Sequence, residues 1–134
     1  MELQDWIKKY EEKTGDKYVK KKGFERLFFP DKGFCEIGVS TELECIMVYR
    51  VCGDIKSWRM VIQSIMQLCG YRRMTTICIR HIKPYMRLLG LTVVDSHETE
   101  LGTAYDVVFE NGRGSVTPIK EETYFVALEV EDNA

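Results

Sequence analysis

The sequence predicts an α/β (α+β) domain in which helices flank a mixed, mostly antiparallel sheet. Short β-prone runs separated by tight turns indicate antiparallel neighbours, because a parallel connection needs a longer crossover. One strand–helix–strand unit, at residues 43–79, indicates a single parallel step. The 134 residues, 45% hydrophobic and 30% charged, suffice for one domain with a buried core. We expect that domain to span residues 1–134.

The N-terminal segment predicts an amphipathic surface helix over residues 2–14, with the core of the domain at 24–130. Gly15 can end the helix in a left-handed conformation. Its apolar residues recur at helical spacing: Leu3, Trp6, Ile7 and Tyr10. Two β-prone runs follow, 24–30 and 33–40, and the Pro-Asp-x-Gly between them is a turn signal.

The middle of the chain gives the clearest pattern. Residues 43–52 are nearly continuously apolar, as expected for a central buried strand. A helix is predicted from an N-cap at Asp54 to a stop at Gly70. A β-branched strand at 74–79 comes next, and then a short helix with Pro84 in its first turn, where proline is tolerated.

Three further strands are expected near the C-terminus. They are "LTVVDS", "TAYDVVFE" and "TYFVALEV". We interpret "ENGRGSVTP", between the last two, as a glycine-rich loop with a strong turn dipeptide.

Composition restricts the class of protein. No apolar run approaches the roughly 18 residues of a membrane span, and the acidic N-terminus differs from a secretory signal. We therefore expect a cytoplasmic protein, of a cell or of a virus-infected cell. The five cysteines show no CxxC pair and fit reduced core thiols. Neither of the two histidines is spaced from a cysteine as in a zinc finger, so no metal site is expected.

Charge is distributed unevenly along the chain. Residues 50–90 carry eight basic side chains and one acidic one, whereas residues 91–134 carry ten acidic and two basic ones. This pattern indicates either a local anion site or cross-sheet pairing with the acidic C-terminal strands. It does not fit a general nucleic-acid binder, which is normally basic over a whole face.

The corner "YRVCGDIKSW", residues 49–58, is the candidate anion site. A helix N-terminus exposes unpaired N–H groups with partial positive charge, and glycine lets a phosphate approach. Lys56 and Ser57 offer further donors. Asp54 favours the alternative that this corner is only a turn with a helix cap. A capping carboxylate competes with an anion for the same N–H groups.

Residues 43 to about 110 resemble the GCN5-related N-acetyltransferase (GNAT) family. The resemblance is carried by the order of elements and by "RLLGL", which covers the end of the short helix and its glycine. It implies acetyl-CoA as cofactor and an amine acceptor as second substrate. The matching cofactor-loop positions run from Arg50 to Ile55. The residues implied to bind the cofactor are Arg50, Val51, Cys52, Gly53, Asp54, Lys56 and Ser57.

The resemblance also implies catalytic candidates. The family's acid is a tyrosine four residues before the glycine, a place that Met86 occupies here. Tyr85 lies one residue earlier, about 100° away on a helix, and its spacing also fits the core. Glu36 and Glu44, on expected strands, are candidate bases; both also fit ordinary solvent-facing positions.

Two other interpretations remain open. The cofactor loop departs from the family pattern at Asp54 and Ile55, as in non-catalytic GNAT-like relatives, some of them virus-encoded. Such a protein would act through a protein partner, bound by segment 50–90 or by the acidic tail "EVEDNA". A weaker alternative is single-stranded nucleic-acid binding by Arg72, Arg73 and Tyr71 with Trp58, although the helical phase of Trp58 fits the core.

Overall fold

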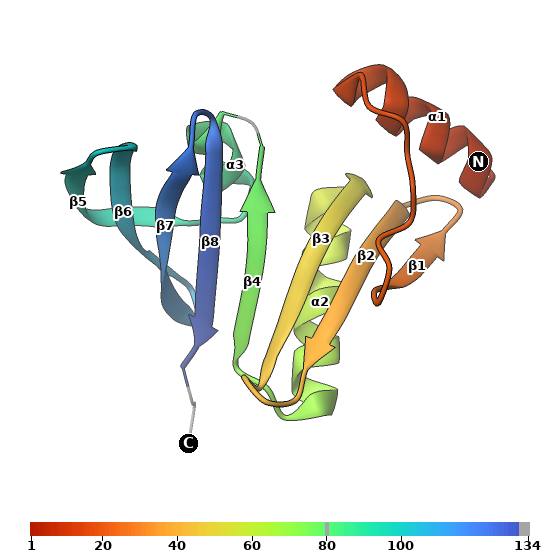
Figure 1. Ribbon diagram of the computed structural model, residues 1–134. Coiled ribbons are helices and arrows are strands. Elements are labelled where there is room, and N and C mark those ends of the chain that lie inside the picture. Colours follow the sequence, from red (N-terminus) through yellow and green to blue (C-terminus); the bar gives the residue numbers. More distant parts are fainter. Residues whose placement is uncertain (80, 132–134) are drawn as a thin grey trace.

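The computed structural model describes residues 1–79 and 81–131, which form one eight-stranded sheet and three α-helices (Figure 1). The helices are α1 (Leu3–Thr14), α2 (Ile55–Cys69) and α3 (Ile82–Leu88). The strands are β1 (Glu25–Phe29), β2 (Gly33–Ser40), β3 (Cys45–Gly53), β4 (Arg73–Cys78), β5 (Thr92–Thr99), β6 (Gly102–Phe109), β7 (Gly112–Lys120) and β8 (Thr123–Val130). None of the helices in these ranges has both the length and the apolarity to cross a membrane.

The sheet is mostly antiparallel, as predicted. Its order is β1-β2-β3-β4-β8-β7-β6-β5. Within the described residues, β3 and β4 are the only parallel neighbours, and α2 is the crossover between them. The single parallel step expected at 43–79 is therefore confirmed.

In the C-terminal half, the hairpin β5–β6 lies at the far edge of the sheet, and β8 and β7 separate it from β4. This half differs from the prediction in one respect. The expected loop at 110–118 is wrong, because only a turn at 110–111 precedes strand β7. Two glycines allow this strand to lie close to β8, since a Cβ at Gly112 or Gly114 would lie 2.1 or 2.3 Å from a β8 carbonyl oxygen.

The predicted glycine stops of α1 and α2 and the Asp54 N-cap are confirmed, whereas α1 begins at Leu3, one residue after its expected start. Gly15 follows α1 with φ 76°, and Gly70 follows α2 with φ 73°, both in the left-handed region that favours glycine. Asp54 is the N-cap of α2, and its side chain accepts a hydrogen bond from the Ser57 backbone N–H. The sequence thus determines both ends of the helix that leaves the candidate corner.

Different helices pack on the two faces of the sheet. We call the face covered by α2 and α3 the helix face, and its core contains residues such as Cys35, Trp58 and Cys78. The opposite face, which we call the α1 face, carries α1 and the segment after it. Phe34 points to the α1 face, because it alternates with Cys35 and its ring contacts those of Tyr10 and Tyr18.

The cysteines fit the prediction of core thiols in part. All five are free thiols. Cys35, Cys45 and Cys78 are buried, and Cys52 is partly buried. Cys69 is exposed, because it is the last residue of α2 and the end of this helix, residues 67–70, is uncovered. Its apolar sequence neighbours therefore gave the wrong environment.

Candidate functional site

The parallel strands β3 and β4 diverge beyond the middle of the sheet. Their pairing ends at Val48 and Thr76, although β3 continues to Gly53 and β4 to Cys78. Figure 1 shows the two strands separating toward their carboxyl ends. On the sides that face each other, the backbone groups beyond this point have no strand partner. Such groups need other hydrogen-bonding partners.

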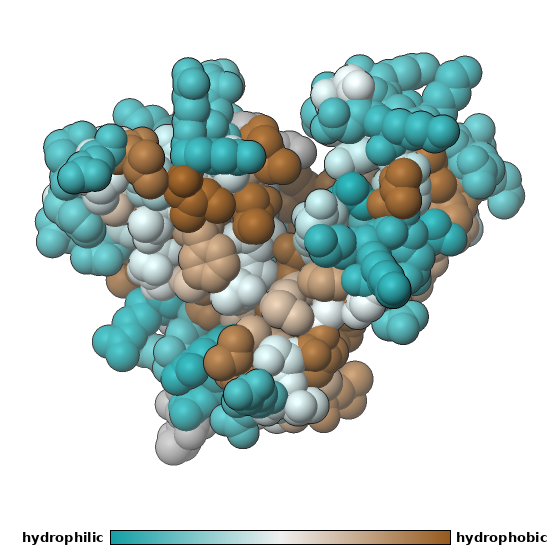
Figure 2. Space-filling model, in the orientation of Figure 1, coloured by the Kyte–Doolittle hydropathy of each residue, from teal (hydrophilic) through white to brown (hydrophobic). Residues whose placement is uncertain are grey.

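A cavity of about 700 Å³ occupies this divergence, and we call it the slot. Its walls come from both faces of the sheet. On the helix face it is lined by Ile62, Gln63, Met66, Leu89, Phe109, Leu128 and Val130, and on the α1 face by Tyr10, Lys13, Thr14, Asp16, Lys120 and Thr123. On the α1 face it opens between α1 and the β7–β8 end of the sheet, where hydrophobic side chains gather (Figure 2). Three exposed isoleucines, Ile77, Ile79 and Ile119, also line the slot.

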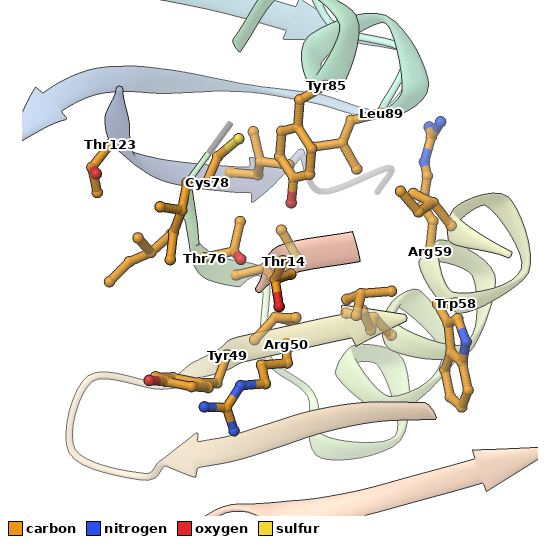
Figure 3. A pocket seen from close by; sticks show the side chains of 18 of the residues that line it. Thr14, Tyr49, Arg50, Trp58, Arg59, Thr76, Cys78, Tyr85, Leu89 and Thr123 are labelled. Carbon is orange, nitrogen blue, oxygen red and sulfur yellow. The ribbon is translucent and has the colours of Figure 1, made fainter. Parts of the chain in front are cut away.

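Tyr85 is the candidate acid that the structure brings into the slot. Its ring packs against the core around α3, and its hydroxyl points into the cavity (Figure 3). Met86, the next residue along α3, is buried in the core. The interpretation of Tyr85 as a core residue therefore holds for its ring but not for its hydroxyl group.

Arg50 contributes to the slot wall, but its guanidinium is held elsewhere. It donates hydrogen bonds to the Glu36 Oε1 (2.8 Å), the Tyr10 hydroxyl (3.1 Å) and the Val19 carbonyl (2.6 Å). Burial alone would lower the pKa of Arg50, but the hydrogen bonds to Glu36 and Tyr10 outweigh it and raise the pKa. With these partners, the guanidinium stabilises the fold on the α1 face.

The two candidate bases lie outside the slot lining. Glu36 is completely buried, and its carboxylate accepts hydrogen bonds from the Lys21 N–H (2.7 Å) and from Arg50. The solvent-facing interpretation of Glu36 is therefore wrong. Glu44 is exposed in the turn before β3, with φ 51°, and not on a strand. Asp16 is the carboxylate found among the described lining residues.

The start of α2 is occupied by its own side chains. The Asp54 carboxylate accepts from the Ser57 N–H (3.3 Å) and hydroxyl (3.0 Å), and hydrogen bonding from Ser57 lowers the pKa of Asp54. Lys32 lies 3.7 Å from the same carboxylate, and its carbonyl accepts from the Asp54 N–H. Gly53 has φ 115° and no room for a Cβ, which would lie 2.0 Å from the Lys32 carbonyl oxygen.

The remaining cofactor candidates are divided between the slot and its surroundings. Val51 lines the slot, and Ile55 also does so. Cys52 is outside the lining, and its Sγ lies 3.6 Å from the Trp6 carbonyl oxygen. Lys56 and Ser57 are in the first turn of α2, also outside the lining. Of the ten candidate residues, the slot brings together Tyr85, Arg50 and Val51.

Arg59 is a site residue that the sequence interpretation did not select. It lines the slot from α2, is partly buried, and has no ion-pair partner among residues 1–79 and 81–131. Its Nη1 would lie 2.9 Å from a Cβ at position 90, so Gly90 leaves room for the guanidinium. The sequence did contain a signal for Arg59. It lies one helical turn after Ile55, so the two side chains are on the same face of the predicted helix.

The structure tests two predictions about the rest of the chain. Trp58 is buried in the core, as its helical phase indicated, so it offers no stacking platform. Arg73 lies 3.7 Å from Glu129 on β8, an ion pair of the cross-sheet kind expected for the basic segment. Arg80 of that segment and residues 132–134 of the acidic tail lie outside the described residues.

Comparisons with known proteins identify no relative of this chain. The chain matches no protein-family model, no curated protein and no solved structure. Within residues 1–79 and 81–131, no group of three or more histidine, cysteine, aspartate or glutamate side chains is placed to hold a metal ion.

Proposed function

We propose that this chain is an acyl-CoA-dependent N-acyltransferase of GNAT-like fold, and that the slot is its active site. The observation that carries the proposal is the Tyr85 hydroxyl in a cavity between two diverging parallel strands. Ligands of α/β sheets bind preferentially at the carboxyl ends of parallel strands. Acetyl is the simplest acyl group, and the acceptor is an amine.

The divergence of the strands gives the thioester a place to bind. The unpaired edge of β3 after Val48 offers backbone N–H and C=O groups to the amides of a pantetheine arm. The N–H near Val51 would then polarise the thioester carbonyl. The amine would enter from the α1 face, where Asp16 and Thr14 stand beside exposed apolar side chains of the lining.

The reaction needs only proton transfers from the protein. The amine nitrogen attacks the thioester carbonyl carbon, the C–S bond breaks, and the tyrosine hydroxyl protonates the departing thiolate. The ammonium proton leaves to a carboxylate or to water. Because the Glu36 carboxylate is already paired with Arg50, Asp16 at the α1-face opening is the better-placed base.

Replacing Tyr85 by phenylalanine tests this role. We expect kcat for acetyl-CoA-dependent acylation of an amine panel to fall by about 10²- to 10⁴-fold, the usual contribution of a general acid. Binding of acetyl-CoA, measured by calorimetry, should change little. Tyr124→Phe is the matched control, because Tyr124 packs against the same core cluster outside the slot lining. Equal activity of the two variants would contradict a proton-transfer role for Tyr85.

The second candidate is a non-catalytic GNAT-like protein that acts through a protein partner. Virus-encoded proteins are among such GNAT-like relatives. The start of α2 favours this second candidate. Asp54 occupies the N–H group that a pyrophosphate would use, and the Ile55 side chain lies in the slot. A negative carboxylate at this place also repels a phosphate.

Thermal unfolding in the presence of acetyl-CoA distinguishes the two functions. A ligand at about 100 times its Kd stabilises the folded state by roughly 2.7 kcal/mol, so the enzyme should show a clear rise in Tm. The absence of a shift at millimolar ligand would favour the non-catalytic protein. A shift gained only in Ile55→Gly would identify the side chain of Ile55 as the block.

A further inference from the structure

Strand β5 forms an uncovered edge of the sheet, away from the slot. It pairs with β6 on one side, and no strand of residues 1–79 or 81–131 lies on its other side (Figure 1). The strand is eight residues long, and all of its residues except Thr99 are exposed. Strand β1, at the opposite edge, has only five residues. A long free edge offers a row of backbone N–H and C=O groups to another strand.

The backbone of Ser96 faces this free edge. Its N–H donates to the Oδ1 of the adjacent Asp95 (2.9 Å), a side-chain acceptor outside the ladder with β6. The turn gives the same phase. The residues that close a two-residue turn, here Thr99 and Gly102, face each other, and the side alternates from one residue to the next, so Ser96 faces outward. The carbonyl of a second strand can replace Asp95 as the acceptor.

The side chains of β5 are complementary to those of a second copy of the same strand. When two β5 strands pair antiparallel around Ser96, this residue lies opposite its own copy, and the outward N–H and C=O groups of the two copies bond to each other. His97 then lies opposite Asp95 of the second copy, and the two-fold symmetry repeats this contact. In such pairs the Cα atoms are about 4.5 Å apart and the side chains are closest. Histidine donates to a carboxylate in either protonation state.

The other registers lack this complementarity. Pairing around Asp95 places two carboxylates opposite each other, and pairing around Glu98 does the same. The Glu98 carboxylate is also engaged within its own chain, where it accepts from the Thr103 hydroxyl (2.5 Å). In the Ser96 register, Glu98 lies opposite Val94 of the second copy, which is exposed. This register therefore pairs the acid and the base of the strand and places no like charges opposite each other.

We propose that β5 is the interface of a homodimer, in which two copies pair antiparallel around Ser96 and the sheet continues from one copy into the other. Strands β8, β7 and β6 separate β5 from β4 and the slot, so the proposal is independent of the transferase function. Sedimentation equilibrium over increasing protein concentration measures the association. The mass of the wild type should rise from that of the chain, 15.6 kDa, toward twice this value.

Charge reversal at the two exposed positions tests the register. Asp95→Lys places a lysine opposite His97, and His97→Glu places two carboxylates opposite each other, so each variant should dimerise at least about tenfold more weakly. An equal mixture of the two variants should associate again, because the introduced lysine then meets the introduced glutamate and the native pair is kept. Glu42→Lys, in the β2–β3 turn at the other side of the sheet, is the control and should dimerise like the wild type.

The results separate β5 pairing from other interfaces. A wild-type chain that stays monomeric at millimolar protein overturns the inference and leaves this edge to a strand of another protein. A dimer that persists in both single variants places the interface elsewhere and also overturns it. So does a mixture of the two variants that fails to associate. Association restored in the mixture, with each variant alone monomeric, supports the proposal.

Discussion

At the residue scale, the Glu36–Arg50 ion pair holds the N-terminal segment against the sheet. The Glu36 carboxylate is completely buried and receives the Lys21 N–H as well as the Arg50 guanidinium. The guanidinium also lies 4.6 to 5.7 Å from the ring centres of Tyr10, Tyr18 and Tyr49, within cation–π range. Because Tyr10 and the end of α1 line the slot, this cluster fixes one wall of the site.

Removing one partner of this ion pair should lower the free energy of unfolding substantially. A buried ion pair that loses one charge leaves the other uncompensated, typically at a cost of about 3–5 kcal/mol. We expect Arg50→Met to lower the free energy of unfolding by about 3 kcal/mol in urea titrations. Adding Glu36→Gln to Arg50→Met should recover part of that loss. A change below about 1 kcal/mol, as for a surface pair, would contradict the role assigned to Arg50.

The cysteines should differ sharply in thiol reactivity. Burial raises the pKa of Cys35 to about 12, so at pH 8 about one in 10⁴ of these thiols is a thiolate, the reactive form. Cys69 is exposed and should react first with a thiol-specific reagent in the native protein. Cys69→Ser should remove that fast phase. Fast modification of Cys35 in the native protein, detected by peptide mass, would contradict the burial.

At the scale of elements, α2 depends on its Asp54 cap. Hydrogen bonds from Ser57 lower the pKa of Asp54 below its ordinary value of 3.8. The stabilising contribution is therefore present above the unfolded pKa and is lost as pH falls through the folded pKa. The same cap occupies the N–H group that a phosphate would need, so helix stability and anion binding compete at this corner.

This competition gives a pH-dependent prediction. Asp54→Ala should lower Tm at pH 7, and its difference from the wild type should shrink as pH falls below about 3.8. Asp31→Ala, at an exposed position in the β1–β2 turn, is the control and should change Tm little. A Tm difference for Asp54→Ala that stays constant from pH 7 to pH 2 would contradict the capping role.

Local chemistry made some elements predictable and left others hidden. Asp54, Gly70 and the apolar spacing between them determine α2, since caps and periodicity act over a few residues. Strand β7 was missed because Gly112 and Gly114 lower local strand propensity, whereas the close approach of β8 stabilises them there. The burial of Glu36 depends on Arg50 and Lys21, partners distant in sequence, so alternation alone gave the wrong side.

At the scale of the whole molecule, the slot results from sheet topology. One parallel pair stands between two antiparallel groups of strands, and this pair diverges after Val48 and Thr76. The parallel step was predictable from one strand–helix–strand unit. The place of β8 beside β4 was not, because that pairing joins residues about fifty positions apart and no local signal specifies it.

The most direct test of the central claim is an amide NMR titration with acetyl-CoA, in which chemical-shift changes report where the ligand binds. We predict that the largest changes fall on Tyr49–Cys52 of β3 and on Ile77 and Cys78 of β4, with smaller ones near Tyr85. Saturable changes confined to other strands, or none at millimolar ligand, would contradict binding between the diverging strands.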